Sequence, residues 1–212
     1  MRNGLIERLE ALNVEIIKMG ALCEKAIEGT TKALFDGDDT YIKRCRIMEE
    51  DIDKCEYDIE SMCMSLILRH QPVASDLRII TSALKMISDM ERIGDQCADI
   101  SSMIRYTKEH DMRDYQHLET MSKAAVKMVN HAVESYVRKD MGLARSVVEM
   151  DDIVDRQFDE AKKNLINLIA REPDNGEFWI DVIMIAKYYE RIADHAVNIA
   201  EWVEYSITGE HK

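Results

Sequence analysis

The stretch Asp89-Met-Glu-Arg-Ile-Gly-Asp-Gln-Cys-Ala-Asp-Ile100 decides the fold, because a related stretch occurs a second time in the chain. Its centre, Glu91-Arg-Ile-Gly-Asp95, returns as Glu190-Arg-Ile-Ala-Asp194, which lies 99 residues later (190 − 91 = 99). An internal repeat sets the architecture before any single motif is interpreted. We therefore expect a chain made of two similar halves.

Turn residues around these two stretches repeat at nearly the same spacing. Asp38 corresponds to Asp140 at an offset of 102 (140 − 38), and Pro72 corresponds to Pro173 at an offset of 101 (173 − 72). Each half therefore has the order helix, short turn, helix, proline turn, helix, which closes most simply as an antiparallel three-helix bundle. We predict a first repeat over residues 1–110 and a second over residues 111–212.

The chain has the composition of an all-α protein. It contains only two prolines and eight glycines in 212 residues, and no useful length of it alternates apolar and polar residues. Leu5, Leu9, Leu12 and Ile16 follow the three- and four-residue spacing of one buried helical stripe. Breaks near 37–38, 71–72, 108–115, 139–140 and 173–176 leave six helices of about 25 to 35 residues each. The predicted fold is two tandem antiparallel three-helix bundles.

Charge and cysteine content narrow the classes of partner. Lys plus Arg number 28 against 41 Asp plus Glu, so the net charge of −13 opposes binding to nucleic acid and to anionic lipid and favours cations and basic partners. No Gly-rich phosphate loop is present, so we expect any connection to phosphate to be indirect.

The five cysteines form no C-x-x-C pair, which argues against a disulfide framework or a thiolate zinc site. No run of 18 apolar residues occurs, and we expect a cytoplasmic protein without membrane insertion.

Carboxylates recur on one face of four predicted helices. In each half the helix after the proline places three oxygen-bearing side chains at i, i+4 and i+8, and the preceding helix adds an i, i+4 pair. Unpaired like charges at this spacing cost about 0.2 to 0.5 kcal/mol each, so a compensating arginine or metal ion is expected. Antiparallel packing would face the two sets and form one oxygen-ligand metal site per half. The candidate ligands are Glu49, Asp53, Glu91, Asp95 and Asp99, then Asp151, Asp155, Glu190, Asp194 and Asn198.

A simpler interpretation of these acids stays open. They are also typical of solvated helix faces in an acidic protein, with Arg92 and Arg191 in ordinary surface ion pairs, which would make the protein a helical adaptor without metal.

His195 adjoins Asp194, but the matching residue of the first half is Gln96, and neighbours at i, i+1 diverge on a helix. We therefore predict a structural role for His195. After the first proline turn, Ser75 or Asp76 is expected to cap the new helix.

The motifs resemble one known family when they are taken together. Pro72-Val-Ala-Ser-Asp-Leu-Arg78, the stretch 89–100, and Tyr189-Glu-Arg-Ile-Ala-Asp-His-Ala-Val-Asn-Ile-Ala200 are similar to the PhoU family of phosphate uptake regulators, and the likeness runs nearly end to end. The resemblance implies a metal ion or metal cluster on each bundle, held by the E/D-x-x-x-D motifs. Iron, zinc, manganese and magnesium remain open as the metal. Asn198 stands where the first half has a carboxylate, so the second site is expected to hold fewer or more weakly bound ions.

The same resemblance implies a function and partners. It implies a negative regulator of phosphate-starvation signalling that links the ATPase of a phosphate ABC transporter to a sensor histidine kinase. It also implies a homodimer that reaches the membrane only through its partners, with no catalytic residue and no organic cofactor.

Two rival functions are weighed against this one. The first is an accessory protein of another phosphate or anion permease, which the sequence does not distinguish from the main hypothesis. The second is a carboxylate-bridged di-metal enzyme, which requires E-x-x-H motifs on long helices. No Glu precedes any of the six histidines by three residues, and the nearest approach is Asp114-Tyr-Gln-His117. The sequence therefore favours a regulator over an enzyme.

Overall fold

A computed structural model describes residues 2–107, 112 and 115–210 of the chain. Within these residues it contains no strand, and the predicted all-α fold with six long helices is confirmed. The boundary predicted between residues 110 and 111 lies outside the described residues. The elements are α1 (Arg2–Asp36), α2 (Asp39–His70), α3 (Ala74–Thr107), α4 (Gln116–Arg138), α5 (Met141–Arg171), the short 3-10 helix η2 (Pro173–Asn175) and α6 (Gly176–Thr208).

Matching aspartates start the second helix of each half. The Asp38 carboxylate accepts a hydrogen bond from the backbone N–H of Thr40 at 2.8 Å and begins α2. Asp140 accepts from the N–H groups of Gly142 and Leu143 at 2.9 and 3.0 Å and begins α5. Each cap satisfies backbone donors that have no partner inside the helix. The repeated aspartates therefore mark the helix starts that the sequence predicted.

The two proline turns reverse the chain in different ways. Gln71 ends α2 in the left-handed region at φ 46°, and the Asp76 carboxylate then accepts from the N–H of Val73 at 3.3 Å, which confirms that Asp76 caps α3. In the second half, Pro173 opens the η2 turn that leads directly into α6. Both prolines stand where a missing backbone N–H breaks no helical hydrogen bond.

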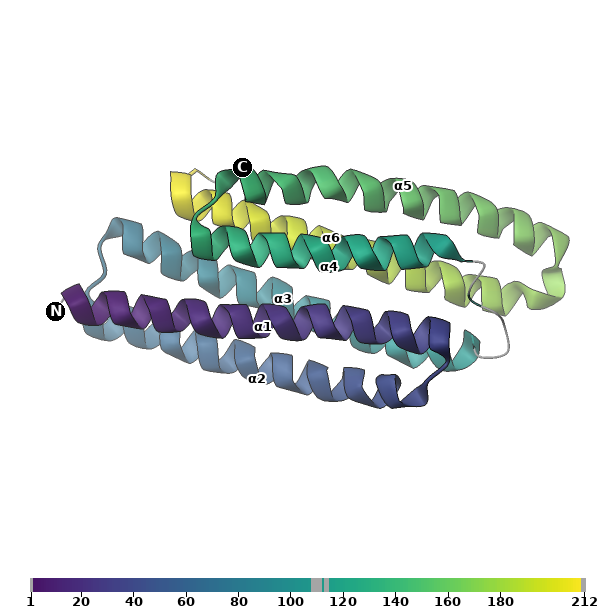
Figure 1. Cartoon of the computed structure of the whole chain (residues 1–212), viewed down its shortest axis with the longest axis horizontal. Helices are drawn as coiled ribbons and strands as arrows, with labels where there is room; N and C mark the ends of the chain where they lie inside the picture. Colours follow the sequence, from purple (N-terminus) through teal and green to yellow (C-terminus); the bar gives the residue numbers. More distant parts are fainter. Residues whose placement is uncertain (1, 108–111, 113–114, 211–212) are drawn as a thin grey trace.

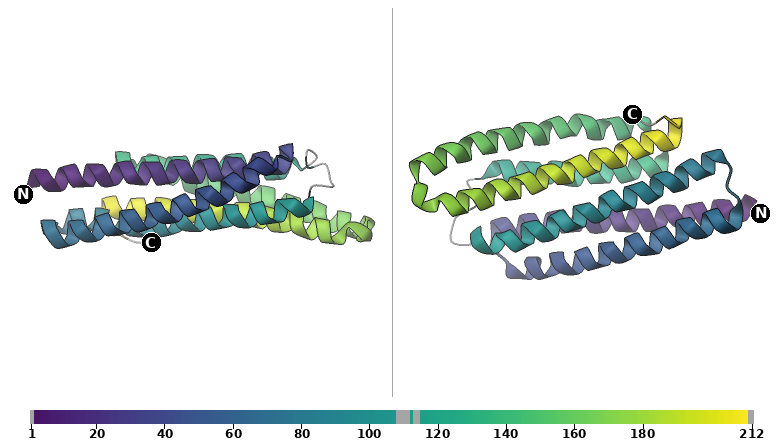
Figure 2. Two further views of the ribbon diagram at one scale, coloured as in Figure 1. Left: turned by 90° about the horizontal axis from the view of Figure 1, so that it is seen from below. Right: turned by 180° about the vertical axis from the view of Figure 1, so that it is seen from behind.

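The six helices form two bundles that lie side by side (Figure 1). Helix α1 packs on α2 and α3, and α4 packs on α5 and α6. Helices α1 and α4 share one face of the molecule, α3 and α6 lie together behind them, and α2 and α5 form the outer edges (Figure 2). The halves meet along α3 and α6 and along α1 and α4. One continuous cluster of buried apolar side chains spans both halves, so the two bundles share a core.

Contacts between the halves occur in equivalent pairs. The Thr31 and Ser122 hydroxyls hydrogen-bond between α1 and α4, and the positions 102 residues away, Val133 and Gly20, also meet. A Cβ added to Gly20 would lie 2.9 Å from Val133 Cγ2. Such reciprocal contacts are what an internal two-fold axis between two repeats produces. The grooves between α2 and α3 and between α5 and α6 are therefore equivalent places in the two halves.

The described helices lack the features of a membrane span. None of them combines the length and the apolar character that crossing a bilayer demands.

Candidate functional site

The first acidic face lies along the groove between α2 and α3. Burial, followed by the charges of Asp53 and Asp95, raises the pKa of Glu49 above its ordinary value. Burial, then Asp95, raises the pKa of Asp53, and burial, then Asp95, raises the pKa of Glu91. These groups influence one another across two helices, so the structure brings both predicted motifs together. We call this set the first acidic face: Glu49, Asp53, Glu91 and Asp95.

Two arginines bring positive charge to the first acidic face: Arg46, which lowers the pKa of Glu49 against the larger effect of burial, and Arg92 at the outer rim. Arg92 contacts Glu91 at 3.5 Å and Asp95 at 3.1 Å, but its side chain is 60% exposed. An ion pair this exposed contributes little and leaves the groove itself negative. Glu56, which sequence analysis missed, adds a further carboxylate that raises the pKa of Glu91 and accepts a hydrogen bond from Ser88 at 3.1 Å.

The second acidic face lies along the equivalent groove between α5 and α6. Its most perturbed member is Asp151, whose pKa is raised to about 6 by burial and then by Asp155, Asp194 and Glu190. Its Oδ1 atom is buried and has no hydrogen-bond partner within the described part of the chain. A buried carboxylate oxygen without a donor is costly and is an apt position for a cation. We call this set the second acidic face: Asp151, Asp155, Glu190 and Asp194.

A lysine distinguishes the second acidic face from the first. Lys187 forms an ion pair with Glu190, and its ammonium lies 5.5 Å from the centre of the Phe158 ring. Its charge lowers the pKa of Asp155 and of Asp194, opposing the larger rise that burial causes. The corresponding residue of the first half is Ser88, 99 positions earlier. The second face therefore contains a cation of its own, which a comparison of the two repeats at this position could have found.

Asp99 and Asn198 lie apart from the other predicted ligands. Asp99 hydrogen-bonds with Tyr188 of the other half, and Asn198 donates to Asp89 Oδ1 at 3.1 Å. An α-helix turns by about 100° per residue, so a side chain eight positions along points about 80° away from the first. That rotation aims both residues at the contact between α3 and α6. His195 Nδ1 lies 2.9 Å from the same Asp89 oxygen, in keeping with the structural role predicted for it.

The two faces were tested for their fit to a metal ion. Both supply several carboxylate oxygens, which hard and borderline cations prefer, and both hold negative charge that the surrounding protein only partly offsets. As the side chains stand, no three Asp, Glu, His or Cys residues of the described chain converge on one point that could hold a metal. Like charges spread apart in the absence of a cation. The type of donor suits such a cation, but the carboxylates would have to rotate toward each other to share one ion.

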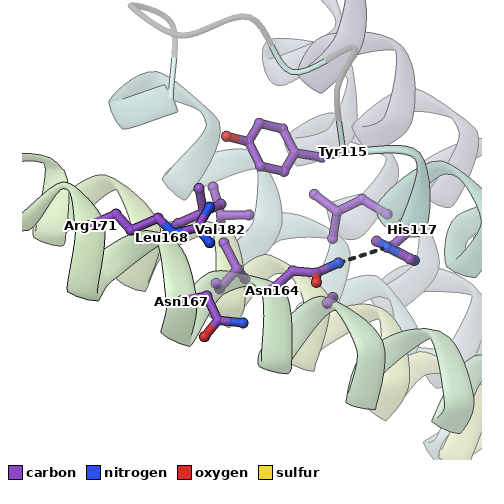
Figure 3. A pocket seen from close by; sticks show the side chains of 10 residues that line it. Tyr115, His117, Asn164, Asn167, Leu168, Arg171 and Val182 are labelled. Atoms are coloured by element: carbon purple, nitrogen blue, oxygen red, sulfur yellow. Dashed lines mark hydrogen bonds between the residues drawn. The ribbon is translucent and has the colours of Figure 1, made fainter.

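A separate cavity of about 500 Å³ opens between the start of α4, the end of α5 and the start of α6 (Figure 3). Leu168 and Val182 contribute to its apolar wall, and Arg171 lies at the side away from His117. Both ring nitrogens of His117 are engaged, one by Gln157 at 2.8 Å and one by Asn164 at 3.3 Å. The histidine is thus held in place by its neighbours. Sequence analysis did not predict this cavity, because its walls come from three separate helices.

Comparisons with known proteins agree with this architecture. The family model of the PhoU domain matches twice, over residues 16–104 and 118–203. The chain is 34% identical over 203 residues to a protein of Pseudomonas aeruginosa named phosphate-specific transport system accessory protein PhoU homolog, covering 95% of this chain and 84% of that one. A protein of the same name from Aquifex aeolicus is 35% identical over 188 residues, covering 88% and 85%.

Solved structures show the same similarity in three dimensions. The crystal structure of PhoU from Pseudomonas aeruginosa superposes with a TM-score of 0.91 at 32% identity, covering 96% of this chain and 99% of that one. The phosphate transport system regulatory protein PhoU from Streptococcus pneumoniae gives a TM-score of 0.89 at 25% identity, covering 98% and 99%. With both repeats matched and the relatives aligned over nearly their full length, the chain belongs to the PhoU family.

Proposed function

We propose that this protein is an accessory protein of a phosphate-specific transport system and that its two acidic faces bind metal ions. The observation that carries the metal proposal is the facing of carboxylates across two equivalent grooves: beyond the rise that burial causes, Asp95 raises the pKa of Glu49 and Asp53, and Glu190 raises the pKa of Asp151 and Asp155. Such an arrangement is unfavourable unless a cation shares the groove. The accessory role is supported by the names of relatives that align over most of the chain.

The proposed metal is a divalent or trivalent ion held by oxygen ligands. Iron, zinc, manganese and magnesium all accept carboxylate oxygens, and the donor set does not select one of them. The first acidic face would hold the ion between α2 and α3, and the second between α5 and α6. A bound ion would neutralise the groove and cross-link its two helices, so occupancy would stiffen each half.

The regulatory part of the proposal concerns the partners. We propose that the protein acts in the cytoplasm, reaches the membrane through its partners, and links the transporter ATPase to a sensor histidine kinase as a negative regulator. A metal-bridged acidic face could contact basic residues of such a partner. Alternatively, metal occupancy could change the angle between the two bundles. A homodimer is part of the same proposal. The rival role, service to another phosphate or anion permease, uses the same surface.

Metal content tests the first part directly. Protein purified without chelating resin or added metal is compared with a six-site variant carrying Asp53→Asn, Glu91→Gln, Asp95→Asn, Asp155→Asn, Glu190→Gln and Asp194→Asn. A control variant makes six amide substitutions at exposed acids elsewhere, at Glu7, Asp36, Asp58, Glu60, Asp174 and Glu201. We expect near-stoichiometric or higher metal in the parent and the control and little in the six-site variant. If all three are empty and take up no added ion saturably, the acids are a solvated face and the protein is an adaptor.

Partner binding is measured separately. The protein is used to capture the purified transporter ATPase and the kinase, once after metal loading and once after chelation. We expect binding that depends on metal occupancy. The absence of binding to either partner in both states would contradict the proposed link, whatever the metal content.

A further inference from the structure

A basic pocket interrupts this acidic protein at the end of the first half. It has a volume of about 230 Å³ and lies between the first turns of α2 and the last turns of α3. Three cationic side chains and two hydroxyls contribute to its wall: Lys43, Arg46, Arg105, Ser101 and Ser102. The chain as a whole carries a net charge of −13, so this local sign is opposite to its surroundings.

The cations of this basic pocket form no close ion pair within the described part of the chain, although the charge of Arg46 lowers the pKa of Glu49 against the larger effect of burial. No carboxylate of the residues described by the structure lies within ion-pair distance of Lys43, Arg46 or Arg105. Arg105 instead lies over the ring of its neighbour Tyr106, 4.7 Å from the ring centre. Like charges held around one hollow repel each other, and an anion between them would remove that repulsion.

The second half shows how the same corner is neutralised when a carboxylate is present. Arg145 occupies the position of Lys43, 102 residues later, and Glu204 occupies the position of Arg105, 99 residues later. Arg145 Nε lies 3.5 Å from Glu204 Oε1, so the second half has an ion pair there. The first half has a second cation in place of the acid. An external anion would neutralise Lys43 and Arg105 in the first half, as Glu204 neutralises Arg145 in the second.

A buried hydroxyl provides an independent sign of a ligand. Ser101 is 4% exposed, lines the basic pocket, and has no hydrogen-bond partner of normal geometry for its Oγ atom. Burial raises the pKa of the Cys45 thiol, and a side-chain interaction with the Ser101 hydroxyl opposes that rise, but sulfur is only a weak hydrogen-bonding group. Buried hydroxyls are normally paired, because an unpaired one loses the hydrogen bonds that water gave it. The corresponding residue of the second half is Ala200, which needs no partner.

We propose that the basic pocket binds a small tetrahedral oxyanion, and specifically free inorganic phosphate. A volume of about 230 Å³ is below the range of about 300 to 1,000 Å³ typical of drug-sized ligands, so a single oxyanion suits it better than a nucleotide. Guanidinium groups and hydroxyls are the donors that phosphate oxygens use. This proposal departs from the expectation, based on the net charge of the chain, that any phosphate connection is indirect. The basic pocket shares no residue with either acidic face, but Arg46 also acts on Glu49 of the first face, so phosphate binding is measured with metal removed.

Phosphate binding to the full-length protein tests the proposal. Titration calorimetry with inorganic phosphate is carried out at low ionic strength, where exposed charges are least screened, and with a chelator present so that bound metal cannot capture phosphate. We expect saturable binding of one phosphate per chain, with sulfate as a competitor. Arg105→Glu, which installs the carboxylate of the second half, is expected to weaken binding at least tenfold. Ser101→Ala is expected to weaken it severalfold.

A second basic hollow serves as the matched control. Arg8, Arg69 and His70 line a hollow of about 240 Å³ at the far end of α2, without the buried unpaired hydroxyl. Arg8→Gln with Arg69→Gln should leave phosphate binding unchanged. The proposal is overturned if no saturable binding occurs, or if binding survives Arg105→Glu and is lost in the Arg8, Arg69 variant. Circular dichroism confirms that each variant is folded, and since chelated protein is used, neither result depends on metal binding.

Discussion

At the scale of single residues, Asp151 shows most directly how the acidic grooves affect the stability of the folded protein. Its carboxyl group combines burial, a buried oxygen without a donor among the described residues, and four neighbouring acids on two helices. Its raised pKa means that the folded protein holds the protonated form more readily than the unfolded chain does. Ionised Asp151 therefore opposes folding until a cation arrives.

The sign of this effect gives a pH prediction. Between the ordinary pKa of 3.8 and the folded-state value of about 6, the folded state binds more protons than the unfolded state, so the free energy of unfolding falls as pH rises through this window. In chelated protein, Asp151→Asn is expected to flatten that fall and to raise the free energy of unfolding at pH 7.5 by about 1 kcal/mol, less than the full shift implies because the group is partly exposed to solvent. Urea denaturation from pH 4 to 8 measures this. The exposed Asp174→Asn, at a residue that does not contribute to the raised pKa of Asp151, is the control, and equal effects of both substitutions would contradict the account.

Two glycines give a second prediction from backbone conformation. Gly37 ends α1 at φ +68°, whereas Gly176 begins α6 at φ −58°, and an added Cβ would meet nothing at either position. Gly37→Ala is expected to lower the free energy of unfolding by about 1 kcal/mol, because an L side chain is strained at positive φ. Gly176→Ala is expected to raise it by about 0.4 to 1 kcal/mol, because it restricts only the unfolded chain. Denaturation midpoints of the two variants should move in opposite directions, and a shift in the same direction would refute the assignment.

At the scale of elements, α3 and α6 are equivalent helices with different electrostatic roles. Both place an acidic pair against the preceding helix, but α6 also brings Lys187 into an ion pair with Glu190 where α3 has Ser88. The departure at Asn198, which suggested a weaker second metal site, is a contact with Asp89 and lies away from the groove. If the two sites differ in affinity, Lys187 is the structural reason.

Exchanging these two residues tests that reason. Lys187→Ser removes a positive charge next to the second acidic face and is expected to lower its metal Kd about fivefold, since one charge at about 4 Å in a water-like medium contributes about 1 kcal/mol. Ser88→Lys is expected to raise the Kd of the first face by a similar factor. Calorimetric titration with one divalent ion resolves the two sites. Unchanged affinities at both sites, in variants that still bind metal, would show that Lys187 does not compete.

At the scale of the whole molecule, the halves are repeats in sequence but one unit in packing. Their shared core and the paired contacts between α1 and α4 and between α3 and α6 leave no apolar boundary at which they could separate without exposing core side chains. Burial of this apolar surface is the main force that holds the bundles together. A signal at one acidic face could therefore reach the other through a rigid contact.

Gly20 tests that contact. Gly20→Ala would place a methyl group 2.9 Å from Val133 Cγ2 on the other half, and overpacking of this kind costs about 1 to 3 kcal/mol. In a Val133→Ala background the same change is expected to be neutral or stabilising, because alanine is the better helix former by about 1 kcal/mol. A double-mutant cycle in urea measures the coupling energy. Additive effects would mean that positions 20 and 133 do not interact across the contact between the halves.

The sequence by itself determined the helices, their ends and the repeat. Asp38, Asp140 and the two prolines act within a few residues of themselves, and apolar spacing along one helix shows which stripe is buried, so these features are local. The two E/D-x-x-x-D motifs of each half could also be assigned, because antiparallel neighbours joined by a short turn must pack against each other. The family resemblance followed from the same motifs and is confirmed.

Only the tertiary structure decided how each charged group is surrounded. Three features depend on side chains from other helices: the orientation of Asp99 and Asn198 toward the opposite half, the position of Lys187 in one groove, and the grouping of cations around Ser101. These distances arise from the twist and crossing of long helices, which residue spacing along one helix does not encode. Electrostatic energy depends on distance and burial in space, so the same repeated motif can form two chemically different sites.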